Sequence, residues 1–175
     1  MRGGPQLRKV AAFCRAVDAI SEGIGKGISF LIIPMVLLLV YEVVMRYGFD
    51  SPTIFAHETS LFLYGTTGMM AGAWVLRRDG HVRMDAIYGR LSLRTRAIID
   101  LATAPLFFLL VVIVLWTGWD MAYFSVTMNE HTQTPWGPPY YILKIAIPIS
   151  AFLILLQGIV KFIRDFLLSC RKELP

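Results

Sequence analysis

The sequence contains little cysteine and little histidine, and this scarcity narrows the chemistry open to it. Cys14 and Cys170 flank the first and last apolar runs without the spacing of a redox pair or a zinc site, so we expect no structural disulfide. The three histidines are predicted at different depths, whereas a membrane haem needs two axial ligands at matching depth. No nucleophile–base signature, zinc-protease motif or phosphate-binding glycine loop occurs. These absences predict neither an enzyme nor a resident cofactor or metal.

Charged residues are also sparse and are separated by long apolar runs. They form 17% of the 175 residues, whereas hydrophobic residues form 56%, above the roughly 45–50% of soluble chains. Each of four apolar segments is long enough to cross a hydrocarbon core of about 30 Å. These segments are residues 27–47, 54–76, 98–121 and 139–162. The sequence therefore predicts an all-α integral membrane protein, a single domain of four transmembrane helices. Prolines at 34, 105 and 148 are expected to kink these helices without breaking them.

Lysine and arginine are distributed unevenly about the predicted spans, and this predicts the orientation. Of the 17 basic residues, all but Arg46 and Lys144 lie in the N-terminal stretch, the loop 77–96 or the C-terminal end. The positive-inside rule then places both termini and the loop 77–96 in the cytoplasm. Within that loop, apolar and charged residues alternate as in an amphipathic interfacial segment, although a frayed continuation of the spans is the alternative. No basic stripe carries stacking aromatics, so we expect membrane lipids and no nucleic acid as partners.

Ionisable side chains within the spans are the first place to look for function. Counting from the helix ends places Glu42, Arg46, Glu58, Asp120 and Lys144 near the external interface. Glu42 and Arg46 are four residues apart and can pair directly, and Glu58, at a similar depth on the next helix, could share the arginine. A proton or ion relay would step across the membrane, whereas these charges are expected in one layer. We therefore favour an ion-pair network that fixes helix packing over a relay.

Glycines and one histidine supply the remaining candidates. Gly68 and Gly72 form a GxxxG pattern, which lets another helix approach closely, either within this chain or in a partner. His81 and Asp85 are four residues apart, a spacing that more often orders a local turn than binds metal. Carrier binding sites normally use discontinuous, glycine-rich spans. None of the four predicted spans has such a break.

Several short motifs, in order, resemble those of a known transporter family. They are Tyr41-Glu42-Val43-Val44-Met45-Arg46-Tyr47-Gly48-Phe49, Pro52-Thr53-Ile54 with Glu58, Gly80-His81-Val82-Arg83-Met84-Asp85, Lys144-Ile145-Ala146-Ile147-Pro148 and Leu156-Gln157-Gly158. Together they resemble the small membrane subunit of tripartite ATP-independent periplasmic (TRAP) transporters. One departure is His57, where that family is expected to carry an aromatic or aliphatic residue.

The resemblance implies a division of labour among three proteins. It implies a large membrane subunit that binds Na⁺ and substrate and moves, and a periplasmic binding protein that delivers the substrate, usually an organic acid. The small subunit would then be a stator in the bacterial inner membrane, with Na⁺ bound by its large partner. The competing hypothesis is a self-contained, homo-oligomeric transporter or channel. That hypothesis requires a polar path across the membrane, which the sequence lacks.

Overall fold

The computed structural model describes residues 5–78 and 93–169, and its regular elements there are all helices. They are α1 (Pro5–Ser29), α2 (Ile32–Gly48), α3 (Ala56–Arg77), α5 (Leu93–Thr127) and α6 (Tyr141–Ser169). The loop between α5 and α6 adds one isolated β-bridge, between His131 and Pro139. The prediction of an all-α fold is confirmed.

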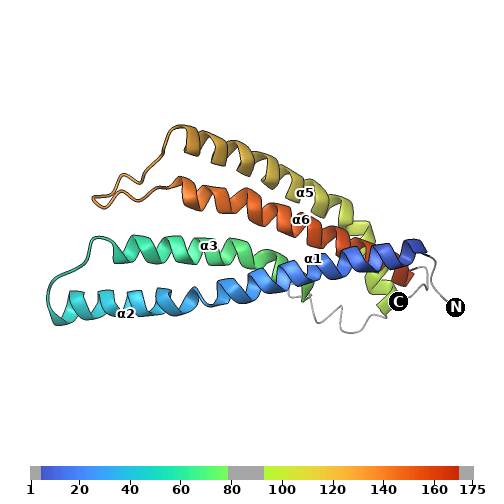
Figure 1. Cartoon of the computed structure of the whole chain (residues 1–175), viewed down its shortest axis with the longest axis horizontal. Coiled ribbons are helices and arrows are strands. Elements are labelled where there is room, and N and C mark those ends of the chain that lie inside the picture. Colours follow the sequence, from blue (N-terminus) through green and yellow to red (C-terminus); the bar gives the residue numbers. More distant parts are fainter. Residues whose placement is uncertain (1–4, 79–92, 170–175) are drawn as a thin grey trace.

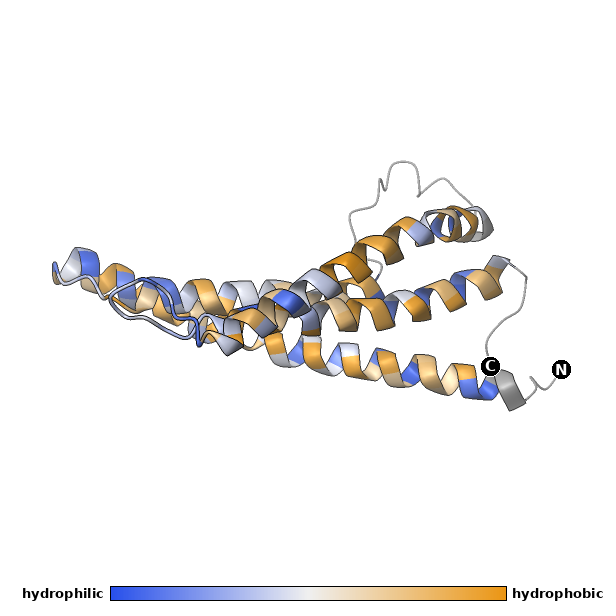
Figure 2. Ribbon diagram, turned by 90° about the horizontal axis from the view of Figure 1, so that it is seen from above, coloured by the Kyte–Doolittle hydropathy of each residue, from blue (hydrophilic) through white to orange (hydrophobic). Residues whose placement is uncertain are grey.

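The helices form an open layer. Figure 1 shows α5, α6, α3 and α2 side by side in that order, with α1 leading into α2 and crossing the ends of α3 and α6. α6 packs most extensively on α5 and then on α3, and α3 also packs on α1 and α2. Figure 2 shows α1, α5 and α6 diverging toward the end that carries the termini. Because each helix packs mainly on its neighbours, many large apolar side chains face outward, as a membrane protein requires.

Three helical stretches of the described part are long and apolar enough to cross a membrane. They are Arg8–Gly48, Thr95–Thr127 and Tyr141–Ser169. α3 corresponds to the predicted span 54–76 and has 22 residues, but it is less apolar and is not among the three. Its hydroxyl, glycine and charged residues lower its hydropathy. That α3 also crosses the membrane therefore stays a prediction.

The first predicted span, 27–47, has different bounds in the structure. The chain turns at Phe30 and Leu31, which separates α1 from α2. Pro34 has no N–H to donate to the carbonyl of Phe30, and that carbonyl accepts the N–H of Ile33 instead, at 3.2 Å. Pro34 thus lies in the first turn of α2, where proline is well tolerated, and not at a kink within a continuous helix. The amphipathic helix α1 was not predicted.

The third and fourth predicted spans are parts of longer helices. α5 has 35 residues and α6 has 29, which at 1.5 Å per residue is about 50 Å and 40 Å. Pro105 and Pro148 lie inside these helices, which continue past them as expected. Both helices are longer than the hydrocarbon core, so they extend beyond it. The pair His81 and Asp85, with the amphipathic segment around it, lies outside the described residues and remains a prediction.

Candidate functional site

A buried polar cluster joins α1 to α6 at the end of the layer where the termini lie. Asp18, Ser21 and Gln157 are 9%, 2% and 1% exposed. The Gln157 amide donates a hydrogen bond to Asp18 Oδ1 (2.9 Å), and the Ser21 hydroxyl donates one to Gln157 Oε1 (3.0 Å). A buried polar side chain costs free energy unless it is paired, and these three pair with one another. The cluster therefore fixes how α1 lies on α6.

Two arginines complete this cluster by neutralising Asp18. Arg164 of α6 donates a hydrogen bond to Asp18 Oδ2, and Nε of Arg77 from α3 lies 3.6 Å from Asp18 Oδ1. Arg77 also donates to Glu22, which in turn pairs with Lys26 at 2.9 Å. One buried carboxylate thus receives contacts from α3 and α6, and charge-assisted contacts of this kind are the stronger hydrogen bonds. We name Asp18, Ser21, Gln157, Arg77 and Arg164 the inner cluster.

Close apolar packing supports the inner cluster. Cys14, Val17 and Val160 form a buried group of side chains between α1 and α6. A methyl group built on Gly25 would lie only 2.4 Å from the Trp74 ring, so only glycine allows α3 to approach α1 so closely there. Packing and polar contacts together hold α1, α3 and α6 in one arrangement.

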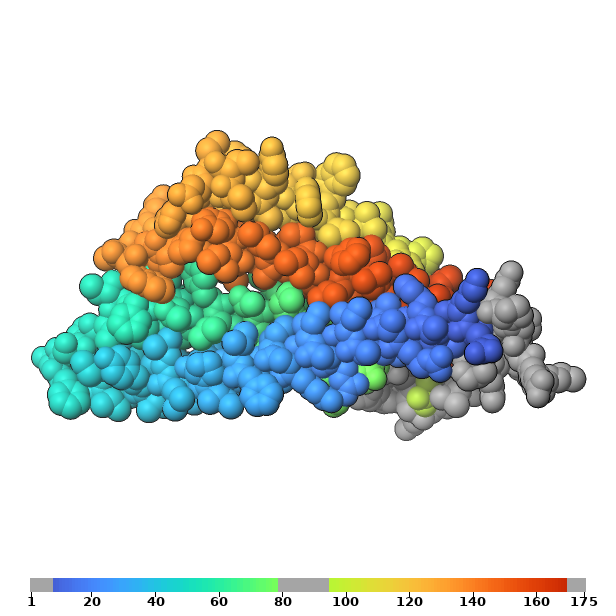
Figure 3. Space-filling view, in the orientation of Figure 1, coloured from blue at the N-terminus to red at the C-terminus, as the bar shows by residue number. Residues whose placement is uncertain are grey.

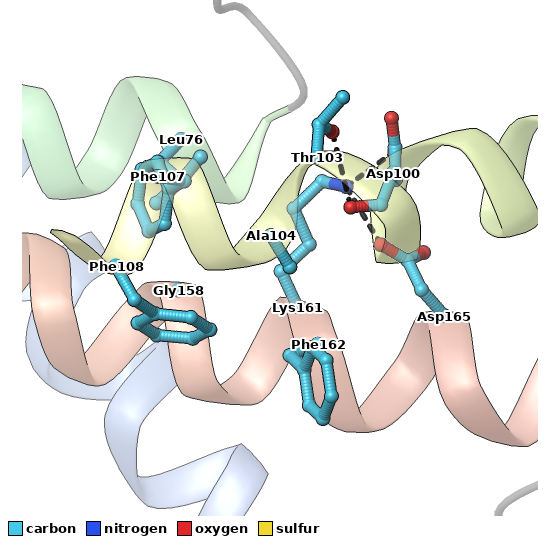
Figure 4. Close-up of a pocket in the computed structure, with 10 residues that line it drawn as sticks. All are labelled: Leu76, Asp100, Thr103, Ala104, Phe107, Phe108, Gly158, Lys161, Phe162 and Asp165. Carbon is cyan, nitrogen blue, oxygen red and sulfur yellow. Dashed lines mark hydrogen bonds and ion pairs between the residues drawn. The ribbon is translucent and has the colours of Figure 1, made fainter. Parts of the chain in front are cut away.

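A second polar contact joins α5 to α6 (Figure 4). Nζ of Lys161 contacts the carboxylate of Asp100 on α5 and lies 2.7 Å from that of Asp165, one turn along α6. These groups line one side of a hollow of about 150 Å³. Its apolar side chains include Phe107 and Phe162. The hollow has room for a few water molecules, and its polar groups already contact one another, so it is a joint between helices.

At the opposite end of the layer, the predicted charges form separate contacts. Arg46 donates to Glu42 at 2.6 Å, as expected for an i,i+4 pair. The other oxygen of Glu42 accepts the backbone N–H of Thr53 at 3.1 Å and its hydroxyl, which ties the loop after α2 back onto the helix. Glu58 accepts a hydrogen bond from the Thr134 hydroxyl at 2.6 Å, so its partner here comes from the loop after α5 and not from α2.

Lys144 has a partner that sequence reasoning missed. Its ammonium group lies 2.6 Å from Glu130 Oε2, and the Ser125 hydroxyl donates to the same oxygen at 2.7 Å. The contact with Lys144, and next the one with Ser125, lowers the pKa of Glu130 in the α5–α6 loop. Asp120, by contrast, is exposed on α5. The outer charges thus form separate local pairs and no common network among the described residues.

The two glycines of the GxxxG pattern face different surroundings. A methyl group on Gly72 would lie 2.8 Å from Cδ1 of Ile154, so Gly72 lies at the contact between α3 and α6. Gly68 is exposed, and a methyl group there would meet nothing within 4 Å. Gly72 therefore serves helix packing within the chain, whereas Gly68 leaves an uncovered patch on the surface of α3.

These polar groups contact one another across and within the helices. Among the described residues, no group of three or more histidine, cysteine or acidic side chains is arranged to hold a metal ion. The polar clusters lie toward the two ends of the layer, and each carboxylate in them contacts an arginine or lysine side chain or a hydroxyl group. Sequence reasoning missed Asp18 and Gln157. The available signal was Gln157 itself, a polar residue inside an apolar span, which calls for a polar partner.

Comparison with known proteins identifies the family. The model of the family described as "Tripartite ATP-independent periplasmic transporters, DctQ component" matches residues 35–168, more than half of the chain. No curated protein matches the sequence. The matched range contains nearly all of α2 and α6 and the whole of α3 and α5, but not α1. The chain therefore belongs to the DctQ family, the small membrane components of tripartite ATP-independent periplasmic transporters.

Proposed function

We propose that this chain is the stator subunit of a Na⁺-coupled, binding-protein-dependent transporter for organic acid uptake. It would pair with a large membrane subunit that holds Na⁺ and substrate, while a periplasmic protein delivers the substrate. Family membership supports the transporter role, since DctQ proteins are components of tripartite transporters. We expect the chain itself to carry no catalytic group, cofactor or Na⁺ site.

The observation that carries this proposal is that helices from distant parts of the chain are fastened together by polar contacts. The inner cluster joins α1, α3 and α6, and Lys161 joins α5 to α6. A subunit that rearranged during transport would have to break these buried contacts in every cycle, at a cost of several kcal/mol. A fixed layer of helices suits the stationary half of a transporter, against which a moving substrate domain can work.

The proposed membrane placement follows from the basic residues. With both termini and the loop 77–96 in the cytoplasm, the inner cluster lies near the cytoplasmic face of the bacterial inner membrane. Glu42, Arg46 and Lys144 then lie near the periplasmic face.

The exposed face of α3 is our candidate for the contact with the large subunit. His57, Tyr64 and Gly68 are exposed along one side of that helix, and Tyr64 is 69% exposed. The same side also carries Leu61, which suits lipid. A histidine and a bare glycine backbone suit lipid poorly, and small and polar residues favour helix–helix contacts in membranes. Replacing Gly68 by a bulky residue should therefore weaken co-purification with the large subunit, and replacing the lipid-suited Leu109 of α5 by another bulky residue should not.

Reconstitution tests the proposed function directly. Liposomes under a Na⁺ gradient are prepared with this chain, the large subunit and the binding protein, together and with each one omitted. We expect uptake of the organic acid only from the complete set. Uptake by this chain alone would favour a self-contained transporter, and full uptake without it would refute the stator role.

A further inference from the structure

The charged residues of α1 differ in whether they have partners within the chain. Its acidic residues, Asp18 and Glu22, contact arginines of α6 and α3. Of its basic residues, Lys26 pairs with Glu22, whereas Arg8, Lys9 and Arg15 are exposed and form no ion pair or hydrogen bond with other described residues. Three cations are thus exposed without an ion-pair partner among the described residues.

Apolar side chains accompany these cations. Phe13 and Ile20, seven residues apart and so on one side of the helix, are 44% and 50% exposed. Lys9 precedes Phe13 by four residues and lies on the same side, whereas Arg8 and Arg15, themselves seven residues apart, lie along the other edge of the exposed surface. In Figure 3, α1 (blue) lies at the front of this face of the molecule, and no other described helix covers it. Exposed basic residues together with exposed large apolar residues on one amphipathic helix are typical of a helix at a membrane interface.

The position of α1 beside a membrane span suggests what this surface meets. The helical stretch Arg8–Gly48 has 41 residues, about 60 Å at 1.5 Å per residue, which is about twice the hydrocarbon thickness. α2 accounts for most of the predicted span 27–47, so much of α1 lies beyond the hydrocarbon. With the proposed orientation, α1 lies on the cytoplasmic side, whose leaflet carries the anionic lipids.

We propose that the outward face of α1, formed by Arg8, Lys9, Phe13, Arg15 and Ile20, binds anionic phospholipid headgroups of the cytoplasmic leaflet. The cations contact the headgroups, and the two apolar side chains enter the boundary between headgroups and acyl chains. Because Asp18 fastens α1 to α6, lipid bound on one face of α1 steadies the helices on its other face. This proposal rests on the orientation proposed above, but not on transport or on the large subunit.

Lipid titration of the full chain tests the proposal. The chain in neutral detergent micelles receives phosphatidylglycerol or, in parallel, phosphatidylcholine, and the midpoint of thermal unfolding is followed. Phosphatidylglycerol should raise the midpoint at a lower concentration than phosphatidylcholine does. A basic residue near an anionic surface contributes about fivefold in affinity, so the variant R8Q/K9Q/R15Q should require roughly a hundredfold more phosphatidylglycerol. The matched variant R8K/K9R/R15K keeps the charges and should behave as the wild type.

A second measurement does not depend on the stability of the triple variant. With Cys14 and Cys170 replaced by serine, an environment-sensitive fluorophore is attached to Phe13→Cys in nanodiscs. Its emission should shift to the blue when phosphatidylglycerol replaces part of the phosphatidylcholine, and the shift should shrink at high salt. Equal responses to the two lipids in both measurements would overturn the proposal. It would also be overturned if R8Q/K9Q/R15Q kept its response to phosphatidylglycerol but lost the large subunit on co-purification, because the face would then bind a protein.

Discussion

Replacing Asp18 by asparagine should loosen the contact of α1 with α6 and lower the stability of the chain. Asparagine keeps the shape and one oxygen for the Gln157 amide, but it removes the charge that Arg164 and Arg77 share. Removing the carboxylate charge in a fully buried site would leave the two arginine charges uncompensated, which costs about 3–5 kcal/mol. The Asp18 side chain is 13% exposed, but that of Arg164 is 39% exposed and can turn toward water. We therefore expect a loss of about 2 kcal/mol, within the range for hydrogen bonds to charged groups.

The assay is equilibrium unfolding of the full chain in mixed detergent micelles, with Asp50→Asn as the matched control. Asp50 is exposed and has a φ of 50°, a backbone conformation that asparagine tolerates well, so this control should change stability by less than about 0.5 kcal/mol. In a double-mutant cycle, adding Arg164→Gln to Asp18→Asn should cost clearly less than it costs in the wild type. A change at Asp18 no larger than the control's, or strictly additive effects, would refute a stabilising role for the inner cluster.

Three further predictions concern topology, pH and packing. In intact cells Cys170 should react only with membrane-permeant thiol reagents, and a cysteine placed at Thr132 should react with an impermeant one; external labelling of Cys170 would contradict the orientation. The pKa of Glu130 is lowered from its ordinary value of 4.5, so its contribution to stability is present above that value and is lost as pH falls through the lowered pKa. Glu130→Gln should accordingly flatten the acid limb of a melting-temperature profile, and an unchanged limb would exclude this contribution. Gly158→Ala should lower the free energy of unfolding in detergent by about 1–3 kcal/mol, because the new methyl group would lie 2.4 Å from the Phe107 ring. Gly68→Ala meets open space and should cost nothing. Equal effects of the two substitutions would show that the Phe107 ring can move aside without cost.

The helices of this protein could be predicted from sequence because apolar runs report directly on length. The helical segments near α3, α5 and α6 follow from that signal, and the pair of Glu42 and Arg46 follows from the i,i+4 spacing of opposite charges. The N-terminal helix could not be found in the same way. Its inward face is made of small and polar residues, such as Ala11 and Ser21, which become buried only because α3 and α6 supply complementary groups.

Partnerships between distant residues were the part that sequence could not supply. Glu58 was assigned to Arg46 on depth alone, yet the loop after α5 folds back and brings Thr134 to it. Glu130 reaches Lys144 because Asn129, with a φ of 47°, turns the chain sharply after α5. Depth along a helix is a one-dimensional measure. Which loop returns to which helix depends on backbone turns that hydropathy does not encode.

The separation in sequence between Asp18 and its partners bears on how the protein is made. Asp18 is 139 residues from Gln157 and 146 from Arg164, so it leaves the ribosome long before either of them. At ~5–20 residues per second, the interval is roughly 7–30 s. During that time, with the proposed orientation, the carboxylate is solvated by cytoplasmic water, so it pays no desolvation cost before its partners are made. The last helix to be synthesised thus completes the contacts of the first one. A chain that stops short of Gln157 would leave α1 packed on α3 without α6, with the Asp18 carboxylate lacking two of its partners, and a quality-control protease could recognise that difference.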